Sequence, residues 1–67
     1  MTKDQAIHKI KVYIVDVYGN QTELAQSIGV SSAYISAIMT GKKEIPSWML
    51  DMVDLEKIEK ITYRRKR

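Results

Sequence analysis

The sequence predicts a small all-α domain of four to five helices, with a C-terminal tail that is extended or forms a short strand. Three observations lead to this fold class. Apolar residues recur at three- and four-residue spacing over most of the chain, which is typical of helices with one buried face. Polar capping residues and glycines divide that pattern into short segments. The length, 67 residues, allows a single domain spanning residues 1–67.

Composition excludes several classes of protein. There is no cysteine and His8 is the only histidine, so neither disulfides nor a Cys/His zinc site can form. No apolar run is long enough for a membrane span, and the N-terminus lacks the apolar stretch of a signal peptide. We therefore expect a cytoplasmic protein without a metal or cofactor. Because the core of so small a chain is marginal, oligomerisation is the expected extra source of stability.

The first helix is expected over residues 2–18. Thr2 and Gln5 have the spacing of a capping box. The run at residues 12–18 is rich in β-branched and aromatic residues and would locally favour a strand, but the helical stripe begins before it and keeps its spacing. Val12 lies opposite that stripe, so it is either an exposed residue or part of a contact with another chain. The stripe consists of Ile7, Ile10, Ile14, Val17 and Tyr18.

The second helix is expected over residues 21–28. Asn20 is a favourable N-cap, and Glu23 completes a pattern like a capping box. Gly29 is expected to end the helix. Its buried face would consist of Leu24, Ala25 and Ile28.

The third helix is expected from Ser32 to about Thr40, with Ser31 as its N-cap and Gly41 as its end. Its buried residues would be Ile35 and Ile38. Helices of about eight residues are not stable alone, so the second and third must pack on each other and on the first.

The C-terminal third of the chain is less regular. Residues 42–45 are expected to form a connector, with Pro46 at the first position of a short helix over residues 47–53. A further short helix around residues 55–58 and an extended tail would follow, although residues 58–65 also fit a strand. The short helix would present Trp48, Met49, Met52 and Val53, either as core or as a dimer patch.

The spacing within residues 21–40 is that of two helices crossing at a steep angle. Ala25 must be small because the third helix crosses close to it. Gly29 allows a positive φ at the turn, and Val30 fills the inside of that turn. The exposed face of the third helix would then consist of Ser32, Ala33, Ser36, Ala37 and Thr40.

Residues 21–41 resemble the helix-turn-helix of the lambda Cro/CI-type repressors, the Xre-like family, and the chain is most similar to short phage Cro-like repressors. The first helix and residues 42–58 fit the family more loosely. The resemblance implies a compact lambda-repressor-like DNA-binding domain. In that family the second helix of the pair enters the major groove while the first crosses the phosphate backbone. The residues that carry the resemblance are Gln21, Ala25, Gly29, Ile35 and Ile38.

The resemblance also implies which residues contact DNA. It places groove-facing side chains at Ser31, Ser32, Ala33, Ser36 and Ala37, and we add Thr40 as a sixth base contact. It places phosphate contacts at Gln21, Lys42 and Lys43, to which we add Thr22, Tyr34, Arg64 and Arg65. Tyr34 is equally consistent with packing. The small groove-facing side chains suit thymine methyls, but none makes a bidentate base contact, so we expect modest base discrimination with affinity from phosphates and DNA shape.

The net charge of +3 is concentrated in the tail. Residues 60–67 contain five basic and no acidic side chains, whereas residues 21–41 contain Glu23 as their only charge. A basic tail suits a polyanion such as DNA, although it is also consistent with a solvated terminus. Attraction to DNA would have to come from the tail and from Lys9, Lys11, Lys42 and Lys43.

Taken together, the sequence predicts a sequence-specific DNA-binding transcriptional regulator, a Cro-like phage or prophage repressor in the bacterial nucleoid. It would occupy a pseudo-palindromic operator as a homodimer, with half-sites about 34 Å apart and a dimer contact over residues 46–63. An enzyme is not expected, since no serine has a histidine or lysine base at motif spacing. We expect neither a membrane nor a small-molecule partner. The alternative is an antitoxin-like or adaptor module that binds another protein.

Overall fold

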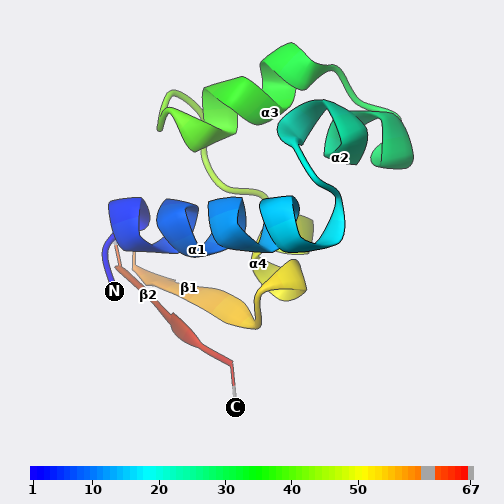
Figure 1. Ribbon diagram of the computed structural model, residues 1–67. Coiled ribbons are helices and arrows are strands. Elements are labelled where there is room, and N and C mark those ends of the chain that lie inside the picture. The colour runs from blue at the N-terminus through cyan, green and yellow to red at the C-terminus, as the bar shows by residue number, and fades with distance from the viewer. Residues whose placement is uncertain (60–61, 67) are drawn as a thin grey trace.

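The structure, a computed structural model, describes residues 1–59 and 62–66. Figure 1 shows one long helix across the middle of the molecule, a pair of helices on one side of it and a two-stranded sheet on the other. Among the described residues, no helix has the length and apolarity needed to cross a membrane. The elements in chain order are α1 (Lys3–Val17), α2 (Gln21–Ile28), α3 (Ser32–Met39), α4 (Ser47–Met52), β1 (Leu55–Glu59) and β2 (Thr62–Arg65).

The expected all-α fold class is wrong, because β1 and β2 pair as an antiparallel sheet. The helix expected around residues 55–58 is a strand, with Leu55 opposite Arg65 and Lys57 opposite Tyr63. Asp54, at φ 55°, turns the chain out of α4 and into β1. A stretch this short cannot be assigned to helix or strand by periodicity alone.

The strand that the sequence also allowed over residues 58–65 is present in part, as β2. Ile61, within that stretch, lies outside the described residues, as do Lys60 and Arg67 of the basic tail.

The N-terminal residues pair with β2 at the edge of the sheet. Thr2 forms a β-bridge with Thr62. The Met1 amino group donates a hydrogen bond to the Tyr63 carbonyl (2.6 Å), and the Tyr63 N–H donates to the Met1 carbonyl (2.8 Å). The start of α1 is therefore held against β2, at the far end of the sequence.

The capping box that begins α1 is confirmed. The Gln5 N–H donates to Thr2 Oγ1 (3.2 Å), and the Thr2 N–H donates to Gln5 Oε1 (2.9 Å). At the start of α4, Pro46 is the N-cap residue rather than the first helical residue, so this prediction was displaced by one position.

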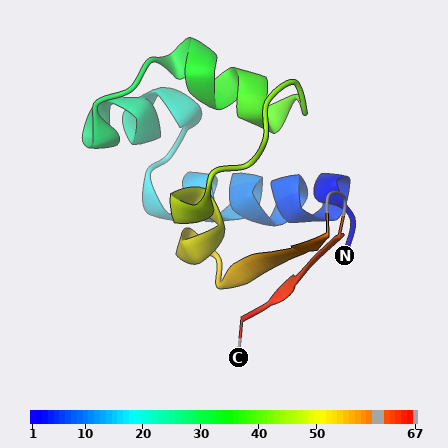
Figure 2. The same ribbon diagram turned by 180° about the vertical axis from the view of Figure 1, so that it is seen from behind.

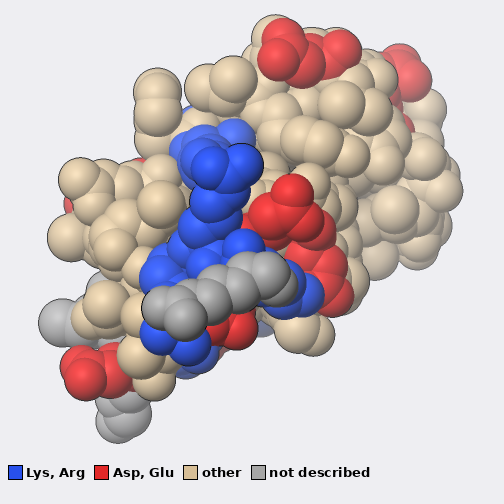
Figure 3. All heavy atoms as spheres, turned by 90° about the horizontal axis from the view of Figure 1, so that it is seen from below, with Lys and Arg blue, Asp and Glu red and all other residues tan. Residues whose placement is uncertain are grey.

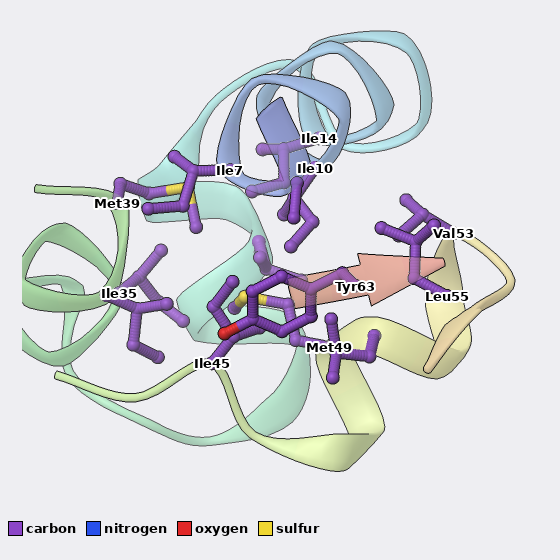
Figure 4. Close-up of a cluster of buried hydrophobic side chains, with 14 of the residues drawn as sticks. Ile7, Ile10, Ile14, Ile35, Met39, Ile45, Met49, Val53, Leu55 and Tyr63 are labelled. Carbon is purple, nitrogen blue, oxygen red and sulfur yellow. The ribbon is translucent and has the colours of Figure 1, made fainter. Parts of the chain in front are cut away.

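A single core lies between α1, the α2–α3 pair, α4 and the sheet (Figure 4). Most of the expected stripe of α1 is buried, but Val17 is 56% exposed, and Ile28 of α2 is 39% exposed. Their expected burial is wrong because each is the last residue of its helix, past the packed face. The fully buried larger side chains are Ile10, Ile14, Leu24, Ile35, Ile38, Met49, Leu55 and Tyr63.

The apolar residues of the segment 46–63 lie mainly in this core. Trp48 and Met52 are partly buried and pack against it, while Ile58 is 47% exposed. The segment expected to form the dimer contact thus contributes most of its apolar surface to the monomer. Its buried members are Met49, Leu50, Val53, Leu55 and Tyr63.

Candidate nucleic-acid interface

The turn between α2 and α3 depends on Gly29. It has φ 79° and ψ 30°, the left-handed conformation that ends many helices. The N–H groups of Gly29 and Val30 both donate to the Ala25 carbonyl, at 2.9 and 3.0 Å. A Cβ at Gly29 would meet nothing within 4 Å, so the backbone conformation, rather than a lack of space, requires glycine here.

Side-chain caps fix the start of both helices. Asn20 Oδ1 accepts a hydrogen bond from the Glu23 N–H (2.8 Å), as expected. Ser31 Oγ accepts one from the Tyr34 N–H (3.1 Å). The Ser31 hydroxyl keeps its proton for donation to a ligand, because the cap uses only an oxygen lone pair.

The inner faces of α2 and α3 are buried against the rest of the molecule. Leu24 and Ala25 of α2 and Ile35 and Ile38 of α3 are buried. In Figure 4 Met39, the last residue of α3, lies beside Ile7 of α1. Since α1 contacts both α2 and α3, the orientation of α3 is set by packing on α1.

The outer face of α3 carries the residues expected to contact bases. Ala37 is half-buried, and its carbonyl accepts from the Thr40 hydroxyl (3.2 Å). With that hydroxyl engaged, the Thr40 methyl is the part left for an apolar contact. Figure 1 shows α3 on the side of the molecule opposite the sheet. The exposed members are Ser31, Ser32, Ala33, Ser36 and Thr40.

Lysines flank the end of α3. Lys42 and Lys43 are exposed, and their N–H groups donate to the Ala37 carbonyl at 2.9 and 3.2 Å. Lys3 Nζ from α1 donates to the Gly41 carbonyl (3.2 Å), which brings a third cation to this loop. The sequence interpretation did not include Lys3 in the site. Lys3 lies four residues before the buried Ile7, so it lies on the same face of α1. This spacing was the sequence signal that could have placed Lys3 near the site.

A second basic position lies at the start of α2. An open hollow of about 430 Å³ there is lined by residues of α1, of the α1–α2 turn and of the first turn of α2. Gln21 is half-buried and Thr22 exposed. A helix N-terminus with a lysine beside it favours a phosphate. The lining residues are Lys11, Ile14, Val15, Gly19, Asn20, Gln21 and Thr22.

Tyr34 is partly buried and packs against the core. This contact fits the packing alternative for Tyr34. A phosphate contact by Tyr34 stays a prediction.

The structure does not bring the tail together with α3. Arg64 is ion-paired with Glu56, and Arg65 is exposed on the sheet. The hydrogen bond from Lys66 to Asp51 raises the pKa of Lys66 above 10.5. Figure 3 shows the molecule from the side of the sheet, where the Lys and Arg side chains lie together with Asp and Glu side chains directly beside them.

No group of three or more potential metal ligands occurs in the part of the chain that the structure describes. Comparisons with protein-family models, with curated proteins and with solved structures gave no match to this chain.

Proposed function

We propose that this protein is a sequence-specific DNA-binding regulator that places α3 in the major groove. The observation that carries the proposal is the α2–α3 unit: a glycine turn, two side-chain caps and a sealed inner face beneath an outer face of small side chains. Such a helix can lie deep in a groove about 12 Å wide.

The chemistry of α3 suggests how much sequence it would distinguish. Ser32 and Ser36 can donate to or accept from base edges, and Ala33 suits a thymine methyl. None of these residues makes a bidentate contact, so each base pair would contribute modestly to specificity. The affinity would come chiefly from phosphates, reached by Lys42 and Lys43 beyond α3 and by Lys11 beside the start of α2.

A repressor that occupies an operator as a homodimer is the regulatory role we propose. A folded unit of this size can block a promoter without a second catalytic or effector site. Two copies related by a two-fold axis would each present α3 to one half of a pseudo-palindrome.

In vitro selection of duplexes from random sequence tests the proposal. We expect an enriched palindromic site. Ser36→Asp places a carboxylate on the exposed face of α3 and should weaken binding to that site by about tenfold or more, equivalent to about 1.4 kcal/mol. Ser47→Asp is the matched control, because it adds the same charge at the exposed start of α4 and should change affinity by less than about threefold.

Two outcomes would overturn the proposal. One is that no sequence is enriched while the two variants bind DNA equally. The other is that the purified protein carries a stoichiometric protein partner and leaves no footprint on DNA, which would favour an adaptor module.

A further inference from the structure

Lys3, in the first turn of α1, reaches the loop that follows α3. Its Nζ donates a hydrogen bond to the Gly41 carbonyl (3.2 Å), 38 residues further along the chain. Figures 1 and 2 both show the end of α3 above the start of α1. Figure 4 shows Met39, at the end of α3, beside Ile7 of α1. The Lys3 side chain therefore joins two elements at a place where core packing already holds them together.

The backbone of the loop fixes the direction of the carbonyl that Lys3 reaches. Gly41 has φ 84°, and its N–H donates to the Ile38 carbonyl (3.1 Å). The Lys42 N–H donates to the Ala37 carbonyl (2.9 Å). This pair of bonds around a left-handed glycine is a Schellman motif, which ends a helix in a defined geometry. The hydrogen bond from Lys3 is thus made to a fixed acceptor.

Three lysines lie at this loop, and none of them is neutralised by an ion pair. Within the described residues, the salt bridges do not include Lys3, Lys42 or Lys43. Glu44, the next residue along the chain, is instead paired with Lys57 of β1 (2.9 Å). The end of α3 is therefore flanked by three cations that are available to an anion.

We propose that Lys3 contacts a DNA phosphate beside those reached by Lys42 and Lys43, an inference that rests on the proposed function. An ammonium group has three N–H donors, so the bond to Gly41 leaves two for phosphate oxygens. A lysine side chain loses rotamer freedom when binding orders it. The bond to Gly41 lowers that cost, because it orders the side chain in the free protein. Lys3 is thus the contribution of α1 to the phosphate contacts at this end of α3.

Binding of a DNA duplex at several salt concentrations tests this role. Lys3→Met keeps the apolar stem and removes the ammonium group. It should reduce the slope of log K against log salt by about 0.9, so the fall in affinity between about 50 and 200 mM salt should shrink by about 3.5-fold. Lys3→Arg keeps the charge and several N–H donors, and it should keep the slope.

Lys9→Met is the matched control, because it removes the same charge from an exposed position of the same helix. The sequence alone left Lys9 as a source of attraction to DNA. In the structure it lies with Asp54 and Arg65 around a hollow on the side of α1 that faces α4 and the sheet, so its loss should leave the slope unchanged.

Circular dichroism should show every variant folded, because the hydrogen bond of Lys3 is exposed. Lys3→Gln is a second neutral variant and should lose as much slope as Lys3→Met.

The inference is overturned if both neutral variants of Lys3 keep the full slope, which would make the bond to Gly41 purely structural. It is also overturned if Lys9→Met loses as much slope as Lys3→Met, since any charge on α1 would then act alike.

Failure of this inference is distinguishable from failure of the proposed function. An enriched palindromic site with an unchanged slope in Lys3→Met would leave the regulator standing and remove the role of Lys3. If no sequence is enriched, the regulator fails, and the same titrations on a duplex of mixed sequence still decide the role of Lys3. A chain that binds no duplex overturns both.

Discussion

Tyr63→Phe should stabilise this protein. The Tyr63 side chain is fully buried, and its hydroxyl has no hydrogen-bond partner among the described residues. In Figure 4 the ring lies within the core, with Met49 nearby and the hydroxyl end toward Ile45. Phenylalanine retains the ring and its contacts and removes only the buried oxygen.

The expected change in the free energy of unfolding comes from the loss of that single oxygen atom. A buried polar group without a partner costs about 1–3 kcal/mol. Removing it should raise the free energy of unfolding by about 1 kcal/mol, because some of the gain is lost to a small void. For a domain of 60–100 residues this corresponds to a rise in Tm of about 4–8 °C.

Urea and thermal unfolding followed by circular dichroism provide the assay. Tyr34→Phe is the control: Tyr34 is half-buried and its oxygen is not among the buried atoms without a partner, so the change should stay within about 0.5 kcal/mol. A loss of about 1 kcal/mol or more in Tyr63→Phe would refute the reasoning, since it would mean that the hydroxyl is hydrogen-bonded in the folded protein.

The same residue predicts an alkaline instability. Burial raises the pKa of Tyr63 above 10.0, the Glu44 carboxylate raises it further, and Lys57 opposes the shift. The folded state thus favours the neutral phenol, and this contribution to stability is complete below the unfolded pKa. It is lost as the pH rises above 10.0 toward the folded pKa. Urea melts across this range should show a steeper loss of stability in the original protein than in Tyr63→Phe.

Two further predictions concern the turn and the basic side chains. Gly29→Ala should lower the free energy of unfolding by about 1–2 kcal/mol in urea melts, because φ 79° is unfavourable for alanine although space is open; an unchanged midpoint would contradict this reason. Each of Lys42→Gln and Lys43→Gln should reduce the slope of log K against log salt by about 0.9 if the lysine contacts phosphate. Arg64→Gln and Arg65→Gln should leave that slope unchanged, because both lie on the sheet, opposite α3; equal losses from both pairs would show that the tail reaches DNA.

The helices were predictable because interactions between residues close in the sequence set their boundaries. Asn20, Gly29 and Ser31 each act within three or four residues, through a cap or a turn. The bounds of α2 were accordingly predicted to the residue. The same local signals predicted the exposed face of α3, since the buried positions of so short a helix determine the remaining ones.

The sheet was not predictable in this way. Leu55 and Tyr63 are buried because the strands that carry them pair with each other, and because β2 also receives Met1 from the other end of the chain. None of these partners lies within one helical turn in the sequence. The same holds for Lys3 at the α3 loop, so this one cation of the candidate site was not predicted, whereas Lys42 and Lys43 were.

The small side chains of α3 bear on the homodimer of the proposed function. In the proposed function, an α3 without bidentate contacts would discriminate weakly at one half-site, because each wrong base pair costs about 1–3 kcal/mol. Two half-sites held by a two-fold axis add their discrimination, so the specificity of the pair is roughly the product of the two. A monomer with this α3 would bind chiefly by charge, and residues 21–41 carry Glu23 as their only charged side chain. In the proposed function, therefore, the small side chains of α3 favour binding by two copies, whose paired half-sites supply the discrimination that one α3 lacks.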